Sequence, residues 1–261
     1  MDSKLLEQLE EFARDRFRGI EDHIFDLTLC CNEDGEDISW EIGEGVDRFR
    51  EWIDSDFFRN GKTKVVVGFD QFPDYVFKIP IKSERCYLYD EYKDRSVFDY
   101  EDSYFYAWEI FDEVSDDFTF FVADSCWDLP SDNCDYCSVE AAVYRYAEKM
   151  GVDSAFAGTW YLCDIGGVNI YVSERVKSYW EYDRRISKNE GVFNSIKNTP
   201  EMYNSNIEKL QLAHLIKDYS YAFALKLVNF IRECNISDLH GDNYGCVNNK
   251  LVILDYSGYR G

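Results

Sequence analysis

The segment SDLHGDNYG contains two aspartates, Asp238 and Asp242, either of which could act as a catalytic base. Five positions after Asp242 stands Val247, which cannot bind a metal, whereas five positions after Asp238 stands Asn243, which can. Asp255 follows Asn243 by 12 residues, enough for a short hairpin. A carboxylate can accept a proton from a hydroxyl group, and an Asn with a second carboxylate can hold Mg²⁺. Asp238, Asn243 and Asp255 therefore form a candidate set, and an ordinary turn with capping residues is the alternative.

The elements that must position these residues follow from the periodicity of the apolar residues. Helical spacing predicts a helical preface at residues 4–28 and 45–54. Two β-rich runs, KTKVVVGF and DYVFKIPI, predict one hairpin, and TWYLCDI with VNIYVSERV predicts another that turns at Gly166 and Gly167. Between the hairpins, CSVEAAVYRYAEKMG predicts a helix with its buried face at Val139, Ala142, Val143, Tyr146 and Met150. The chain is then mostly helical until a last strand in KLVILDYSG.

This order of elements, with DLHGDN as its loop motif, resembles the protein kinase fold. It is similar to atypical kinases, aminoglycoside phosphotransferases and small phage-encoded kinase-like proteins. The resemblance implies an α+β, two-lobed fold with a small antiparallel β lobe, one key helix, a reduced helical lobe and a helical N-terminal extension. It covers roughly residues 58–261 and divides the chain into an extension (1–57), a small lobe (58–175) with an acidic insertion at about 84–135, and a truncated large lobe (176–261).

A kinase holds the nucleotide phosphates with a Lys on the third strand of its small lobe, and a helix Glu fixes that Lys. The resemblance assigns these roles to Lys78 in DYVFKIPI and to Glu140, with Glu148 as the second choice for the Glu. Taken alone, Lys78 also fits a surface position on an edge strand. Glu140 also fits a first-turn acid, which the helix dipole favours.

The resemblance further implies that the chain binds ATP and Mg²⁺. The segment IYVSERV is similar to the strand beside adenine, so that Ser173, Glu174 and Arg175 would offer backbone groups to the ring and Val172 would lie near the back of the pocket. Asn243 and Asp255 would bind the metal. The loop that cradles the phosphates should be rich in Gly, but FFRNGKTKVVV offers Gly61 alone.

Other departures from the family concern regulation and substrate binding. The His-Arg pair before the catalytic Asp is replaced by Ile236 and Ser237, so control by activation-loop phosphorylation is not expected. Asp-Phe-Gly becomes Asp255, Tyr256 and Ser257. Six residues follow Asp255, so we expect neither an activation segment nor the helices that hold a peptide substrate.

The composition limits the partners. The 261 residues carry 51 Asp and Glu against 28 Lys and Arg, a formal net charge of -23, which disfavours nucleic acids and anionic membranes as partners. Without a signal sequence or an apolar run of membrane length, and with nine Cys interpreted as mostly reduced thiols, the chain is expected to be cytoplasmic. Cys126, Cys134 and Cys137 could contribute to a zinc site, although buried free thiols are the stronger interpretation.

Two hypotheses about function follow. The first is a minimal phosphotransferase of the serine/threonine kinase type, with Asp238, Lys78 and Glu140 as its catalytic residues, acting on a host protein or a small molecule. The second is a catalytically weak or inactive pseudokinase whose acidic surface binds and inhibits a basic or nucleic-acid-binding partner protein. A scaffold that binds ATP without transferring phosphate is a third and weaker alternative. The oligomeric state is not predicted.

Overall fold

The computed structural model describes residues 1–24, 27–31, 44–61, 63–81, 83–90, 105–108, 118–123, 135–178, 207–234, 236 and 239–256. Within these residues the fold is α+β, as predicted. The chain separates into two compact units that interleave in sequence. Unit 1 comprises Met1–Val67, Ile79–Asp135 and Cys163–Ile170, and unit 2 comprises Gly68–Lys78, Tyr136–Leu162 and Tyr171–Gly261. Among the described helices, none has the length and apolar character needed to cross a membrane.

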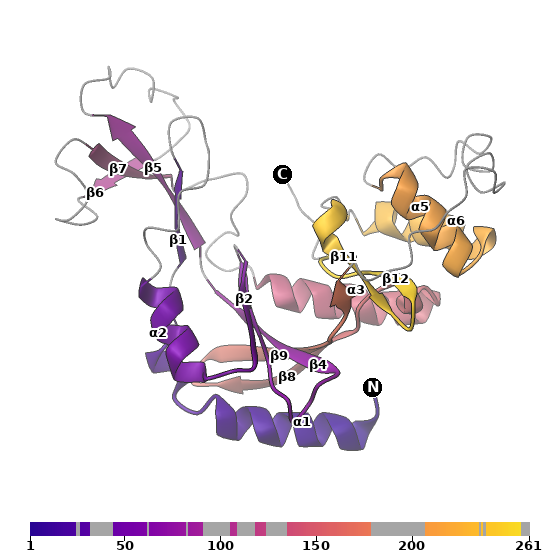
Figure 1. Ribbon diagram of the computed structural model, residues 1–261, viewed down its shortest axis with the longest axis horizontal. Helices are drawn as coiled ribbons and strands as arrows, with labels where there is room; N and C mark the ends of the chain where they lie inside the picture. Colours follow the sequence, from indigo (N-terminus) through magenta and orange to yellow (C-terminus); the bar gives the residue numbers. More distant parts are fainter. Residues whose placement is uncertain are drawn as a thin grey trace. The chain divides into compact units, whose positions relative to one another are not determined.

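Unit 1 begins with helix α1 (Ser3–Arg16; Figure 1). This helix buries Leu9 and Ala13. The sequence predicted a helix as far as residue 28, and this length was wrong. Gly19 has a φ of 81°, a left-handed value that an α-helix cannot continue through. The chain turns there into a short 3-10 helix (Ile20–Asp22) and later forms strand β1 (Leu27–Cys31).

Helix α2 (Glu44–Ile53) lies where the sequence predicted it and packs with α1. Arg16 of α1 donates from its guanidinium to the carbonyl oxygens of Ile53 and Asp54, which satisfies carbonyls that the end of α2 leaves without helical partners. The ring of His23 stacks on that of Trp52 with their centroids 4.4 Å apart. The helical preface is therefore a packed pair of helices.

The acidic insertion predicted at about 84–135 contains strands that the sequence analysis did not predict. Strands β1, β5 (Ser83–Asp90), β7 (Phe118–Ala123) and β6 (Phe105–Trp108) form a four-stranded sheet in that order. β5 pairs with β1 in parallel and with β7 antiparallel. Clustered acids concealed the β pattern in the sequence, because charged residues are depleted in strands.

A five-stranded antiparallel sheet contains β2 (Phe57–Asn60), β3 (Lys64–Gly68), β4 (Tyr75–Pro80), β9 (Val168–Glu174) and β8 (Thr159–Ile165), in that order. Both predicted hairpins are present. β8 and β9 turn at Gly166 and Gly167, whose φ values of 60° and 87° suit a primed turn. β2 was not predicted, because its sequence FFRN leads directly into the polar turn at Gly61.

The helices of unit 2 are α3 (Tyr136–Met150), α5 (Lys209–Asp218) and α6 (Tyr221–Glu233). α3 ends as predicted at Gly151, which has a φ of 63°. α5 and α6 are neighbours in Figure 1 and in their contacts. Ser220 separates them, because its hydroxyl accepts a hydrogen bond from the backbone N–H of Phe223 and so caps the start of α6.

A small antiparallel sheet completes unit 2: β10 (Lys177–Ser178), β11 (Tyr244–Val247) and β12 (Lys250–Ile253). β12 is the predicted last strand. The hairpin of β11 and β12 turns at Asn248 and Asn249, whose φ values of 50° and 59° are tolerated best by Gly, Asn and Asp. The core beneath includes Ala147, Leu212, Leu227, Phe230, Leu251 and Ile253.

Candidate functional site

Lys78 and Glu140 form a buried ion pair within unit 2. Nζ of Lys78 lies 2.5 Å from Oε2 of Glu140, and the two side chains are 8% and 0% exposed. Lys78 does not lie on an edge strand, because β4 runs between β3 and β9. Two charges buried this deeply require one another, since either alone would lack compensation for its lost hydration.

The packing of α3 against β9 brings the two charges together. Lys78 of β4 lies directly opposite Tyr171 of β9 in the strand register. Cys137 and Ala141 of α3 form a buried cluster with Tyr171. Glu140 lies on the same face of α3 as these two residues, one turn after Cys137, so the contact that seats the helix also directs its carboxylate toward Lys78.

The most buried residues of α3 are offset from the predicted apolar face, of which Val143, Tyr146 and Met150 are partly buried against the core. The structure buries Cys137, Glu140, Ala141, Tyr144 and Ala147. Apolar periodicity predicted the helix correctly but not its rotation, because a buried carboxylate counts as a polar position in such a pattern. Glu148, the second choice as partner for Lys78, is exposed.

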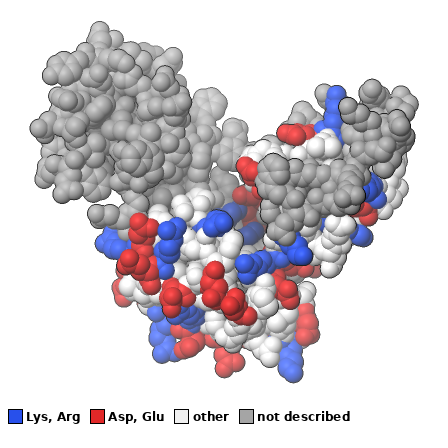
Figure 2. Space-filling model, viewed as in Figure 1, with Lys and Arg blue, Asp and Glu red and all other residues white. Residues whose placement is uncertain are grey.

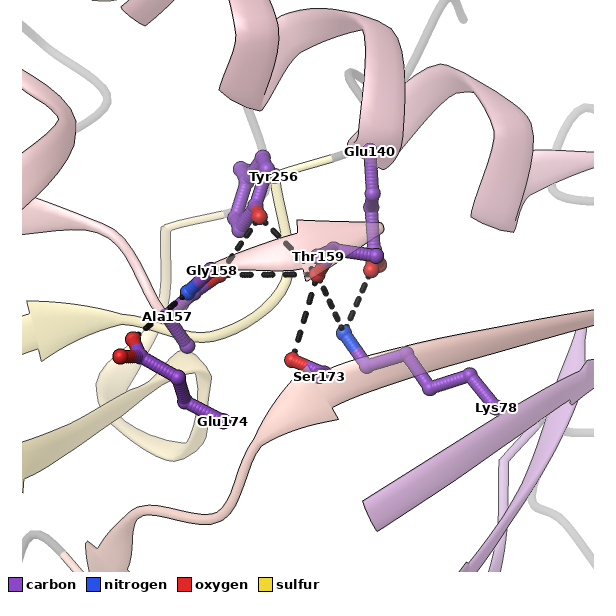
Figure 3. Close-up of polar contacts among 8 residues, drawn as sticks. All are labelled: Lys78, Glu140, Ala157, Gly158, Thr159, Ser173, Glu174 and Tyr256. Atoms are coloured by element: carbon purple, nitrogen blue, oxygen red, sulfur yellow. Dashed lines mark hydrogen bonds and ion pairs between the residues drawn. The ribbon is translucent and has the colours of Figure 1, made fainter. Parts of the chain in front are cut away.

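Three hydroxyl groups lie beside the ion pair (Figure 3). Oγ1 of Thr159 is 3.5 Å from Nζ of Lys78 and 3.2 Å from Oγ of Ser173. The hydroxyl of Tyr256 is 3.0 Å from the same Thr159 oxygen and donates to the carbonyl oxygen of Ala157 at 2.6 Å. Thr159, Ser173 and Tyr256 are all buried. The cluster defined by Lys78, Glu140, Thr159, Ser173 and Tyr256 is called the Lys78 cluster below.

Sequence reasoning missed two members of this cluster. Thr159 was part of a predicted strand and carried no motif, and Tyr256 was noted only as a replacement for Phe. Ser173 was predicted as a nucleotide contact but lies inside the cluster. The sequence did contain one indication of this cluster, the hydroxyl of Tyr at position 256. A buried Tyr usually has a hydrogen-bond partner for its O–H.

The backbone N–H groups of Glu174 and Arg175 are engaged within unit 2, so these two donors are not open to an adenine ring. The N–H of Glu174 donates to the carbonyl oxygen of Gly158 at 3.0 Å, and the N–H of Arg175 donates to that of Asp74 at 2.7 Å. The Glu174 carboxylate also accepts from the N–H of Gly158 at 2.9 Å. Val172 is buried opposite Phe77 in the sheet.

The hairpin of β11 and β12 brings Asn243 and Asp255 close together. Tyr244 pairs with Ile253, and one step further the N–H of Leu254 donates to the carbonyl oxygen of Asn243 at 2.9 Å. Asp255 is the next residue. Both Asn243 and Asp255 are half-buried. The segment from Asn243 to Asp255, a spacing of 12 residues, thus forms a closed hairpin, and the residue at each end has a side-chain oxygen that could bind a metal.

Asp238, the predicted base, lies outside the described residues. The structure does describe His240, which begins the short 3-10 helix Gly241–Asn243 by accepting from the backbone N–H of Asp242 at 3.3 Å. Asp242 itself is exposed.

Two further predictions concern Gly61 and the cysteines. Gly61 belongs to unit 1, where its N–H donates to the carbonyl oxygen of Lys64 at 2.8 Å and closes the turn between β2 and β3. Cys126 and Cys134 lie outside the described residues. Cys137 is buried. Within the described segments, no three His, Cys, Asp or Glu side chains gather as a metal site.

The electrostatic setting keeps the neighbouring phenols protonated. Burial raises the pKa of Tyr256 well above its ordinary value, and the nearby Glu140 carboxylate raises it further. Burial also raises the pKa of Tyr144, and the charge of Glu174 adds to the effect. Both side chains therefore act as neutral hydroxyls, of which that of Tyr256 is a hydrogen-bond donor.

The chemistry of the donors at the hairpin fits Mg²⁺ better than zinc. An amide oxygen and a carboxylate are hard ligands, and Mg²⁺ is commonly bound by one or two protein carboxylates together with substrate phosphates and water. Asn243 and Asp255 supply such a pair, and Lys78 supplies a fixed positive charge suited to a phosphate.

Comparison with known proteins gave no match: no family model, no curated protein and no solved structure is significantly similar to this chain.

Proposed function

We propose that this protein is a minimal, protein kinase-like phosphotransferase that uses Mg-ATP. The observation that carries the proposal is the buried ion pair of Lys78 and Glu140. It joins the third strand of the five-stranded sheet to a helix, and protein kinases use a strand Lys and a helix Glu in this arrangement to hold the nucleotide phosphates. Replacing a buried ion pair by apolar residues is often neutral or stabilising, so a requirement other than stability favours keeping one.

The roles follow from the chemistry of the residues. Lys78 binds the phosphates, and Glu140 with Thr159 holds its ammonium in place. An ammonium has three N–H donors, and the described partners of Lys78 use two of them. Asn243 and Asp255 bind Mg²⁺, which neutralises negative charge on the β- and γ-phosphates when bound.

The proposed reaction is transfer of the γ-phosphoryl group to a hydroxyl of the substrate. A bond forms between the hydroxyl oxygen and the γ-phosphorus while the bond from the γ-phosphorus to the β–γ bridging oxygen breaks. The electron pair leaves with ADP, and the hydroxyl proton passes to Asp238, a role that rests on the spacing to Asn243 in the sequence. A host protein is the proposed substrate, with a small hydroxyl compound as the alternative.

Binding of Mg-ATP is the first test. A ligand at about 100 times its Kd stabilises the folded state by about 2.7 kcal/mol, which raises the Tm of a chain of this size by roughly 5–10 °C. We expect that rise for the wild type and for Asp242→Ala, but not for Asp255→Ala. Asp242 is the matched control because it is an exposed acid of the same loop. Equal shifts in all three proteins would contradict the assignment of Asp255.

Transfer is tested with ATP labelled at the γ-phosphate and Mg²⁺, following label into the protein itself, into proteins of a host lysate and into free phosphate. We expect incorporation with the wild type and with Lys149→Met, which removes an exposed Lys of α3. Lys78→Met and Asp238→Asn should each reduce it at least 100-fold, because each removes a group that acts in the transition state. Absence of label from all three pools would end the proposal of transfer.

A binding protein without transferase activity is the second candidate, and the engaged backbone N–H groups of Glu174 and Arg175 favour it. In this alternative, the acidic insertion binds a basic partner. Residues 84–135 contain 16 Asp and Glu and three Lys and Arg, a large share of the net charge of -23. On the face shown in Figure 2, acidic and basic side chains of the described residues are interspersed.

Salt dependence separates the two candidates. Binding of a basic partner through the insertion should weaken strongly between 50 mM and 500 mM salt, because exposed charges are screened over about 10 Å at 0.1 M. It should be unchanged in Lys78→Ala. A partner whose capture depends on Lys78 and Mg-ATP would instead indicate a kinase substrate.

A further inference from the structure

The side chain of Tyr256, the residue after Asp255, makes both a ring contact and hydroxyl contacts. It is fully buried, and its ring packs edge-on against Phe156 with the centroids 4.9 Å apart. A Phe would fill the same space. The hydroxyl adds a hydrogen bond of 2.6 Å to the carbonyl oxygen of Ala157 and a contact of 3.0 Å with Oγ1 of Thr159 (Figure 3).

The backbone at Ala157, two residues before β8, is itself tied to the hairpin that carries Asp255. The N–H of Ala157 donates to the carbonyl oxygen of Ile253 at 2.8 Å. Tyr256 follows Ile253 by three residues and returns to the carbonyl oxygen of the same Ala157. The segment 253–256 is thus fastened to Ala157 at both of its ends, and Asp255 lies between the two attachments.

Thr159 continues the connection toward Lys78. Its Oγ1 is shared by the phenol of Tyr256, the hydroxyl of Ser173 and the ammonium of Lys78, at 3.0, 3.2 and 3.5 Å. The Lys78 ammonium is fixed on its other side by Glu140 at 2.5 Å. One hydroxyl oxygen therefore links the residue after Asp255 with the cation that Glu140 holds.

We propose that the hydroxyls of Tyr256 and Thr159 are a positioning pair, which holds the Asp255 segment and the Lys78 ammonium in a fixed relation within unit 2. Neither residue touches the reacting atoms. The coupling of the two hydroxyls is inferred from the contact between them. Its effect on phosphate transfer rests on the proposed function. A Phe and a Val at these positions would preserve the volume but remove the link.

A double-mutant cycle tests the coupling without any nucleotide. Urea unfolding midpoints are measured for the wild type, Tyr256→Phe, Thr159→Val and the double variant. If the hydroxyls are linked, the two single effects will not add, because the second substitution removes a bond that the first has already broken. The control cycle pairs Tyr256→Phe with Tyr219→Phe, whose hydroxyl bonds Ser154 and Leu251 instead, and its effects should add. Additive effects in both cycles would overturn the proposal.

Kinetics then separate positioning from simple stabilisation. Below the unfolding temperature, Tyr256→Phe and Thr159→Val should each lower kcat about twofold to tenfold, the loss expected for one neutral hydrogen bond, and change KM for ATP less. Thr159→Ser keeps the hydroxyl and should restore kcat. Unchanged kcat in both variants, with an active wild type, would reject the positioning role. If the wild type neither binds nor turns over ATP, the proposed function is wrong. The double-mutant cycle then still decides whether the two hydroxyls are coupled.

Discussion

Ion pairs occur in two contrasting settings in this molecule. On α1 of unit 1, Arg14 and Glu10 lie 2.8 Å apart one helical turn from each other, and their side chains are 54% and 39% exposed. In unit 2, Lys78 and Glu140 are 62 residues apart in sequence, lie 2.5 Å apart, and are almost fully buried. The Arg14–Glu10 pair forms within a single helix. The Lys78–Glu140 pair forms only when helix α3 packs against the sheet that contains β4.

The two kinds of pair are expected to contribute differently to stability. An exposed pair contributes roughly 0.2–1 kcal/mol to stability, because water already solvates its charges well. A buried pair must repay the desolvation of both charges, and its net contribution is often zero or unfavourable. Stability alone is therefore a weak reason for a buried Lys78–Glu140 pair, which is why we propose a functional role for it.

The largest expected effect comes from removing one buried charge. Glu140→Ala leaves the Lys78 ammonium buried without its partner and should destabilise the protein by about 3–5 kcal/mol. Glu10→Ala, the matched change on α1, should cost no more than about 1 kcal/mol. Both are measured as free energies of unfolding in urea. Similar losses for the two variants would remove the distinction between the settings.

Removing both buried charges tests whether the loss of stability in Glu140→Ala comes from the uncompensated charge of Lys78. Lys78→Met combined with Glu140→Leu should recover most or all of the stability lost in Glu140→Ala, because no uncompensated charge remains. The double variant should nevertheless give no thermal shift with Mg-ATP. A double variant as unstable as Glu140→Ala would show that the pair itself is needed for folding.

The next effect concerns the tight packing beside the cluster. A Cβ at Gly158 would collide with the ring of Trp160, which packs edge-on against Tyr144 with centroids 5.1 Å apart. Gly158→Ala should therefore cost about 1–3 kcal/mol through overpacking. At Gly241, no atom lies within 4 Å of the added Cβ and φ is not positive, so Gly241→Ala should be nearly neutral. Calorimetric Tm values distinguish the two.

Alkaline pH should destabilise unit 2. Burial raises the pKa of Tyr219 above 10, so above pH 10 the unfolded chain loses this proton more readily than the folded one, and stability falls as pH rises. The slope per group is at most about 1.4 kcal/mol per pH unit and is reduced here because the side chain is partly exposed. Urea unfolding at pH 9–11.5 should show a shallower fall in Tyr219→Phe than in the wild type. Identical slopes would contradict the role of burial.

The smallest effect belongs to the surface pair. Arg14→Ala should lower stability by about 0.2–1 kcal/mol at low salt and by less at 1 M salt, where screening is strong. Glu140→Ala should lose stability to a similar extent at both salt concentrations, because buried charges are poorly screened. A strong salt dependence of the Glu140→Ala effect would indicate that water reaches the pair.

The sequence predicted the turns and helix ends that are determined by residues close together in the chain. The Gly166 and Gly167 turn, the end of α3 at Gly151 and the hairpin between Asn243 and Asp255 all follow from spacing and turn residues. Predictions that ignored a turn residue were wrong, as at Gly19, where apolar spacing alone extended α1 too far. The four-stranded sheet was missed because its strands lie among clustered acids.

The sequence by itself indicated which residues to consider, since Asn243 and Asp255 were chosen by type and spacing, and Lys78 and Glu140 through the resemblance to protein kinases. The tertiary structure decided which of them meet. The rotation of α3 depends on Cys137 and Ala141 packing against Tyr171, and that contact directs Glu140 toward Lys78. The link from Tyr256 through Thr159 likewise joins residues 97 apart in the chain. Spacing along a strand or helix encodes neighbours within that element, but contacts between elements arise only when their buried faces pack together.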